Sequence, residues 1–196
     1  MKYMKLVVSA AILASVHLAA AQDQNSVSAT TEPGKASVSG AKKVTATVEK
    51  IDAATRTVTL KRHDGKVVDI QLGPEARNFD QLKVGDVVTA VYQEALTLSL
   101  KKGGNGQTSM QETPSIERSA VGEKPGGKVA REVKVTANVV AVDERAHTVT
   151  VKGPEGGLMD LQVNDPAQLQ NVKPGDQVEA VYTEALAISV KPAQSK

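Results

Sequence analysis

The sequence predicts an all-β protein made of two copies of one small unit, at residues 44–101 and 133–192. Three observations predict this class. Apolar and polar residues alternate along most of both segments, which is the period of a β-strand. Turn-forming residues separate the alternating runs at short intervals, as in small sandwiches and barrels. The second segment also repeats the first, and an internal repeat indicates duplication of a folding unit.

The repeat is too long to be a coincidence. The segment Thr57-Val58-Thr59-Leu60-Lys61 returns 91 residues later as Thr148-Val149-Thr150-Val151-Lys152. The segment from Gly85 to Leu96 returns with an offset of 90 residues as Gly175 to Leu186. One residue is therefore missing from the second copy between these two matches.

The first two strands of the unit are expected on either side of a polar turn. Val44, Ala46 and Val48 alternate with polar residues, and the phase then slips near Lys50, which indicates a β-bulge or a sharp bend. Residues 52–56 are polar and turn-forming, and the next alternation predicts a second strand with an inward side of Val58 and Leu60.

Three further strands complete the unit. Asp64-Gly65 is a hairpin signal that leads into a third strand with Val68, Ile70 and Leu72 inward. Residues 75–84 form the one connection without a strand pattern, with Phe79 and Leu82 as apolar plugs. Gly85-Asp86 opens the fourth strand, which buries Val88, Ala90 and Tyr92, and the fifth strand buries Leu96, Leu98 and Leu100.

Five strands, a bent first strand and a connection between strands three and four fit a five-stranded OB-like barrel, with an SH3-like barrel as the alternative. Closure into a barrel would remove the open edges of such a sheet. The prediction is two tandem OB-like small barrels. Residues 22–43 and the linker at residues 102–132 are rich in Ser, Thr, Gly and Pro without apolar periodicity, so both are expected to be disordered.

The N-terminal residues 1–21 have the pattern of a secretory signal peptide. A short positive stretch precedes an apolar run from Leu6 to Ala21, and Ala19-Ala20-Ala21 supplies the small residues that a signal peptidase needs. We expect cleavage near Ala21-Gln22 and a periplasmic or secreted mature chain. No later segment reaches the length of a membrane span, which is about 20 apolar residues.

Composition excludes several classes of protein. The chain has no Cys, which rules out a disulfide scaffold and a thiol enzyme. Without Lys2 and Lys5 of the leader, 22 basic residues balance 22 acidic ones. Nucleic-acid binding needs basic surface and aromatic stacking platforms. The mature chain has only Phe79, Tyr92 and Tyr182, with both tyrosines expected in the core, so we expect no nucleic-acid partner.

Copper-type metal binding is the alternative function. Cu(I) prefers thioether and imidazole ligands, and the mature chain offers Met110, Met159, His63 and His147. Neither histidine recurs in the other repeat, and both fall in predicted turns. We therefore expect exposed turn histidines and no bound cofactor or metal.

The best candidate for a ligand or partner face is a set of outward polar residues on the third strand of each unit. Asp69 and Gln71, and their counterparts Asp160 and Gln162, alternate with core positions. No Ser/His/Asp order stands at a recognisable motif, so we do not expect an enzyme. The partner of this face would be an envelope protein or a small polar ligand.

The unit also resembles a family. The residues that carry the resemblance are 48–52, 57–60, 78–86 (Asn-Phe-Asp-Gln-Leu-Lys-Val-Gly-Asp) and 92–96 (Tyr-Gln-Glu-Ala-Leu). They resemble uncharacterised exported small OB-like β-barrel proteins of Gram-negative bacteria. The resemblance implies a bacterial envelope setting and no particular chemistry. The sequence thus favours a non-enzymatic periplasmic binding or protein-interaction module.

Overall fold

The computed structural model describes residues 24–74, 76–104 and 106–193. Nearly all of its regular structure is β-strand, which confirms the all-β prediction. The predicted signal peptide, residues 1–21, lies outside the described residues. Within them, no helix has the length and apolar character needed to cross a membrane.

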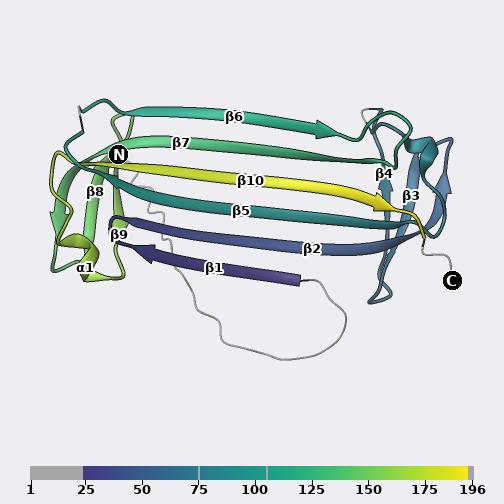
Figure 1. Cartoon of the computed structure of the whole chain (residues 1–196), viewed down its shortest axis with the longest axis horizontal. Helices are drawn as coiled ribbons and strands as arrows, with labels where there is room; N and C mark the ends of the chain where they lie inside the picture. The colour runs from purple at the N-terminus through teal and green to yellow at the C-terminus, as the bar shows by residue number, and fades with distance from the viewer. Residues whose placement is uncertain (1–23, 75, 105, 194–196) are drawn as a thin grey trace.

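The described chain contains ten strands, one 3-10 helix (η1) and one short α-helix (Figure 1). Their bounds are β1 (Gln24–Glu32), β2 (Lys35–Asp52), β3 (Thr57–Arg62), β4 (Val67–Gln71), η1 (Phe79–Gln81), β5 (Val87–Lys101), β6 (Ser109–Arg118), β7 (Gly126–Asp143), β8 (Thr148–Lys152), β9 (Leu158–Gln162), α1 (Pro166–Leu169) and β10 (Gln177–Lys191).

All ten strands belong to one open antiparallel sheet. The main path runs β4-β3-β2-β5-β10-β7-β8-β9, while β1 pairs with β2 and β6 pairs with β7. Six long strands therefore lie side by side in the order β1-β2-β5-β10-β7-β6, and we call this layer the central sheet. The first lobe (β3, β4 and η1) lies at one end of it, and the second lobe (β8, β9 and α1) lies at the other (Figure 1).

The strand pairing does not close either predicted barrel. The predicted fourth and fifth strands are one continuous 15-residue strand, β5. The reason is local: Gln93-Glu94-Ala95 contains no Gly, Pro or Asn that would turn the chain. The strand therefore runs straight on, and β10 occupies the edge that barrel closure would have used.

The structure also places strands where disorder was predicted. Strand β1 and the beginning of β2 lie within residues 22–43, and β6 and the beginning of β7 lie within residues 102–132. The beginning of β2 pairs with β5, and that of β7 pairs with β10. Backbone hydrogen bonds to a long neighbouring strand satisfy N–H and C=O groups whatever the side chains are. Weak apolar periodicity was therefore a poor guide to disorder here.

The bulge predicted near Lys50 is confirmed. The register between β2 and β3 shifts between Val48 and Lys50, and the second half of the chain has the same shift between Val139 and Ala141. The N–H of Val48 donates to the carbonyl of Asp86 at 2.9 Å, and the N–H of Gly85 donates to the carbonyl of Val48 at 2.8 Å. Each bulge thus marks the point where a long strand leaves the central sheet and enters a lobe.

Two separate apolar clusters form the buried core. The cluster of the first lobe contains Val48, Val58 and Leu82, with Phe79 packed against it. The cluster of the second lobe contains Ala137, Val139, Val149, Val151 and Leu169. Leu82 and Phe79 thus lie at the core as expected.

Other predicted core residues are exposed. The third strands of the units, β4 and β9, are edge strands, so Val68, Ile70 and Met159 are 48%, 41% and 41% exposed. Tyr92 is also 36% exposed, because β5 passes through the open middle of the sheet rather than through a barrel.

The pairing of β5 with β10 relates the two halves. Glu94 pairs with Glu184, and these are the two residues that the sequence repeat matches. Tyr92 pairs with Leu186, and Leu96 pairs with Tyr182, which are again matched positions exchanged between strands. The pairing therefore has an approximate two-fold axis at the Glu94–Glu184 pair, perpendicular to the sheet.

Candidate functional site: the apolar face of the central sheet

The four residues predicted as a binding face are split between the lobes. Asp69 and Gln71 lie on β4, and Asp160 and Gln162 lie on β9, at opposite ends of the molecule (Figure 1). Their polar groups bind neighbouring atoms of the same lobe.

The carboxylates take part in cross-strand pairs, and the amides tie down turns. Thr59 donates to Asp69 at 2.6 Å, and Thr150 donates to Asp160 at 2.7 Å. Gln71 donates to the carbonyl of Thr55 at 3.2 Å, and Gln162 donates to the carbonyl of Ala146 at 3.0 Å. These contacts stabilise the hairpins of each lobe.

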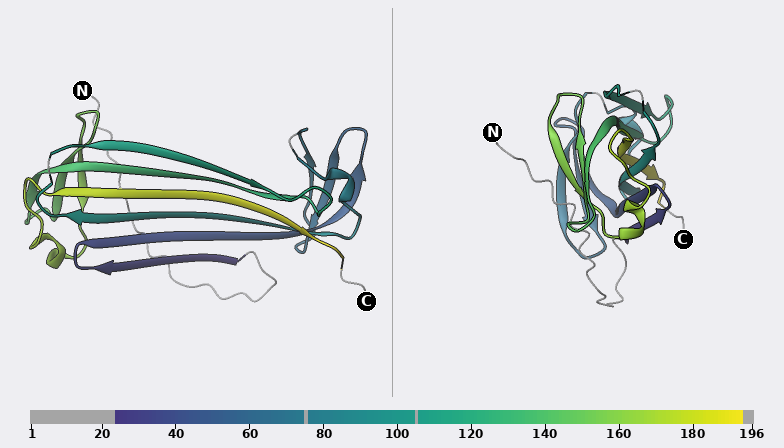
Figure 2. Two further views of the ribbon diagram at one scale, coloured as in Figure 1. Left: turned by 45° about the horizontal axis from the view of Figure 1, so that its top comes forward. Right: turned by 90° about the vertical axis from the view of Figure 1, so that its left-hand side faces the viewer.

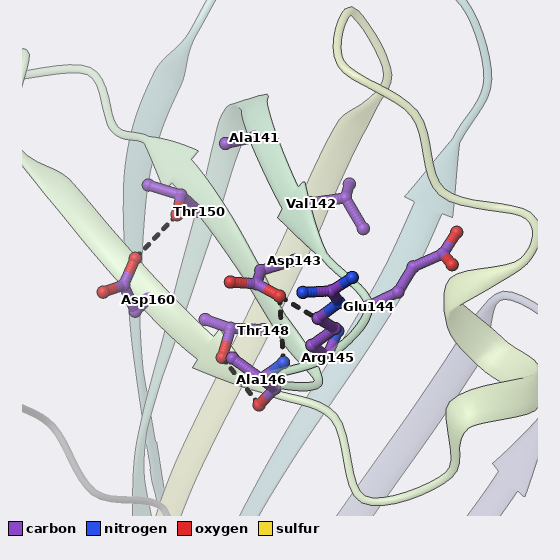
Figure 3. A pocket seen from close by; sticks show the side chains of 9 residues that line it. All are labelled: Ala141, Val142, Asp143, Glu144, Arg145, Ala146, Thr148, Thr150 and Asp160. Carbon is purple, nitrogen blue, oxygen red and sulfur yellow. Dashed lines mark hydrogen bonds between the residues drawn. The ribbon is translucent and has the colours of Figure 1, made fainter.

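A cavity of about 630 Å³ lies beside Asp160 in the second lobe (Figure 3). Its lining includes Asp143, Arg145, Thr150 and Asp160. Asp143 Oδ1 accepts the backbone N–H groups of Arg145 and Ala146, both at 2.9 Å. Asp143 and Asp160, two of the three carboxylates of this lining, are thus bonded to the local backbone and to Thr150.

The candidate metal ligands do not converge. His63 lies in the turn between β3 and β4, whereas His147 lies in the turn before β8, on the other lobe. Met110 on β6 and Met159 on β9 are 59% and 41% exposed. Across residues 24–74, 76–104 and 106–193, no three His, Asp or Glu side chains are grouped as metal ligands.

A different feature distinguishes the central sheet: its exposed large apolar side chains gather on one face, which we call the apolar face, although Lys42, Arg131 and Glu112 also lie on it. Strand register and the alternation of side chains place the following residues of β5 and β10 on this face between the lobes. They are Ala90, Tyr92, Glu94, Leu96 and Leu98 of β5, and Ala180, Tyr182, Glu184, Leu186 and Ile188 of β10. The five positions of one strand match those of the other in the sequence repeat.

Flanking strands extend this face. Val38 of β2 pairs with Leu96, and Val129 of β7 pairs with Leu186. The outer strands add Val27, Ile116 and Met110. Large side chains on this face are well exposed: Val27 82%, Val38 38%, Met110 59%, Ile116 62%, Val129 58%, Leu186 43% and Ile188 44%.

The opposite face of the central sheet is polar. It presents Thr89, Thr97 and Ser99 of β5 and Thr183 and Ser189 of β10, among others. Side chains there bond to one another, as Ser37 does to Thr97 at 2.8 Å. An open sheet with one polar side normally packs its other side against a core. The apolar face therefore has the character of a contact surface.

Both lobes lie on the apolar side. The cluster of the first lobe includes Val88 and Val190, and that of the second lobe includes Val178, all three from the same face of β5 and β10. Figure 2 shows the lobes at the two ends of the long strands. The apolar face is thus bounded by one lobe at each end of the long strands and is open at the β1 and β6 edges.

A polar cluster lies at the centre of the apolar face. The hydroxyls of Tyr92 and Tyr182 donate to Glu94 at 3.3 Å and to Glu184 at 3.4 Å. Partial burial and then the Glu184 carboxylate raise the pKa of Tyr92 to about 12. Arg131 donates to Glu184 at 3.1 Å.

The two glutamates differ in their neighbours. Glu94 pairs across the strand with Gly40 at the place where Glu184 has Arg131. No ion pair joins Glu94 to another residue of the described chain. Like charges opposite one another are unfavourable in a sheet, so Arg131 offsets the repulsion on one side only.

Two buried aspartates hold the linker to the lobes. Asp86 is 2% exposed and accepts from Lys124 at 2.6 Å, and Asp176 is 7% exposed and accepts from Lys102 at 3.0 Å. Each also accepts the backbone N–H of the residue three positions upstream, Lys83 for Asp86 and Lys173 for Asp176. Burial acts to raise the pKa of Asp176, but hydrogen bonds from Lys102 and Gly103 hold it below its usual value.

Sequence reasoning missed the apolar face because it assigned Tyr92, Leu96 and Leu98 to a barrel interior. A signal was present: the alternation over residues 87–101 is unbroken, and it is far longer than the usual strand of about five or six residues. Comparison of the chain with protein-family models, curated proteins and solved structures found no match.

Proposed function

We propose that the protein is a non-enzymatic binding or protein-interaction module of the bacterial periplasm, and that its contact surface is the apolar face between the lobes. The observation that carries the proposal is the exposure of Val129, Leu186 and Ile188 on the apolar face of the six-stranded central sheet. Monomeric soluble proteins rarely leave apolar patches larger than a few hundred Å² uncovered, and larger ones mark interaction sites.

The area of the apolar face supports its role as a contact surface. Six strands at about 4.8 Å span roughly 29 Å, and the nine residues from Ala90 to Leu98 at about 3.4 Å span roughly 30 Å. The product is about 870 Å² of surface, close to the roughly 800 Å² that one partner contributes to a specific interface. The face is therefore large enough for a protein partner.

We also propose that the sheet consists of two OB-like units that arose by duplication and joined through β5 and β10. Supporting observations are the sequence repeat, the matched bulges after Val48 and Val139, and the pairing of Glu94 with Glu184. The leader pattern of residues 1–21 supports export to the periplasm.

The test compares two double variants. Leu186→Ser with Ile188→Ser makes the apolar face more polar, whereas Ala187→Ser with Ala185→Ser changes the opposite face of the same strand. We expect the first variant to reduce the fluorescence of a bound hydrophobic dye and to lose the proteins captured from an envelope extract. The second variant should keep both properties. If the two variants retain the same partners equally, the apolar face is not the contact surface.

A further inference from the structure

The two outer edges of the central sheet are built differently. Strand β6 carries Glu112, Pro114, Glu117 and Arg118 within ten residues. Charged residues and proline are the usual means of keeping a sheet edge from pairing with another chain. The nine residues of β1 contain no proline and a single charge, Glu32 at the last position. Edge β1 therefore lacks the protection that edge β6 has.

Val27 of β1 occupies the position that Pro114 has in β6. Val27 pairs with Gly40, which pairs with Glu94, and Pro114 pairs with Arg131, which pairs with Glu184. Glu94 and Glu184 are matched by the repeat, so the two outer residues correspond. A proline has no N–H, and the Pro114 nitrogen therefore faces away from β7.

The outward direction of Val27 follows from the same alternation. The N–H of Leu100 donates to the carbonyl of Gly34 at 2.7 Å, so Gly34 bonds to β5. Every second residue of a strand bonds to the same neighbour, so Gly40 also bonds to β5 and not to β1. Val27, opposite Gly40, then directs its N–H and C=O away from β2. Asn25, Ala29 and Thr31 do the same, because every second residue of a strand bonds to the same side. All nine residues of β1 are exposed, and among the described residues the strand pairs with β2 alone.

We propose that β1 pairs antiparallel with β1 of a second copy of this chain, in a two-fold register centred on Ser28. In this register Val27 faces Ala29 of the other copy and Asn25 faces Thr31, so the outward N–H and C=O groups meet one another. Each Glu32 faces Gln24, and the two carboxylates lie at opposite ends of the pair. The segment is thus complementary to itself in both hydrogen bonding and charge, as a two-fold interface requires.

The pairing also continues the apolar face. Val27 and Ala29 lie on the same side of the sheet as Val38 and Leu96, since Ala29 pairs with Val38 and Val38 pairs with Leu96. The dimer would join the apolar faces of the two copies into one surface at this edge. The exposure of Val27, at 82%, is what a residue at such a seam has in a single copy.

The test measures molar mass by light scattering or sedimentation equilibrium at micromolar concentration. The wild-type chain should have twice the monomer mass. Val27→Pro should raise the dimer dissociation constant about thirtyfold, because each dimer loses two hydrogen bonds that together contribute about 2 kcal/mol. The repeat position of Pro114 indicates that this variant keeps the β1–β2 pairing. Val27→Thr retains the N–H and should remain a dimer.

Two results would overturn the inference. The first is a monomeric wild-type chain, and the second is a Val27→Pro variant that dimerises as the wild type does. If Leu186→Ser breaks that dimer, self-association belongs to the apolar face instead. Amide exchange gives a second measurement: the N–H groups of Asn25, Val27, Ala29 and Thr31 should exchange more slowly as concentration rises.

Discussion

Replacement of Lys124 by alanine tests whether the segment between β5 and β7 is held to the first lobe. Lys124 Nζ lies 2.6 Å from Asp86 Oδ2 and 2.7 Å from the carbonyl oxygen of Gln81. The Asp86 side chain is 3% exposed and that of Lys124 is 21% exposed. Removal of the ammonium leaves a buried carboxylate without its counter-charge, which costs about 3 kcal/mol of unfolding free energy.

The matched control is Lys102→Ala in the other half of the chain. Lys102 lies 3.0 Å from Asp176, but its side chain is 57% exposed, and Gly103 also donates its N–H to that carboxylate at 3.1 Å. Water replaces an exposed ammonium at little cost, so the expected loss is below about 1 kcal/mol.

Urea unfolding followed by far-ultraviolet circular dichroism measures both losses, since the chain has no Trp. Combining Lys124→Ala with Asp86→Asn should recover part of the stability, because no buried charge remains. Equal losses for Lys124→Ala and Lys102→Ala, or a loss below about 1 kcal/mol for Lys124→Ala, would refute the reasoning.

Three further outcomes are expected. Because the pKa of Asp176 is lowered from 3.8, its stabilisation is complete above that value and is lost as the pH falls below it; melting temperatures of Asp176→Asn should therefore depend less on pH in acid than those of the wild type. Because the pKa of Tyr92 is raised from 10.0 to about 12, absorbance titration of the phenols should show a group ionising near 12, and stability should decline as the pH rises from 10 through 12; a titration complete by pH 11 would contradict this. Val48→Ala, at 1% exposure, should cost about 2 kcal/mol in urea unfolding, whereas Val27→Ala, at 82%, should change stability by less than about 0.5 kcal/mol in the monomer.

Sequence patterns predicted the local features of the fold well. The slip in alternation near Lys50 located the bulge, the glycine turns located the hairpins, and Leu82 was placed in the core. Each of these depends on residues within a few positions of one another. The same patterns failed for Val68 and Ile70, since alternation shows that one side of a strand is apolar but not that anything covers it.

The candidate site could be predicted only in part. The repeat located the Tyr-x-Glu pairs at residues 92–94 and 182–184, but nothing local indicated that β5 would pair with β10 and bring them together. Asp69 and Asp160 lie on β4 and β9, and their hydrogen bonds to Thr59 and Thr150 depend on the partner strand.

The order of the amino acids alone predicted an all-β chain and the turns and bulges within each half, because these depend on backbone conformation and short-range alternation. Only the tertiary structure decided that the strands form one open sheet, that Lys102 and Lys124 hold residues 102–132 to the lobes, and that Leu186 and Ile188 face solvent. The physical reason is that strand partners are chosen by hydrogen bonds between segments far apart in the chain, and any strand edge offers the same N–H and C=O groups. Which edge is taken is settled by the whole set of pairings, here by the match of β5 with its own repeat, β10.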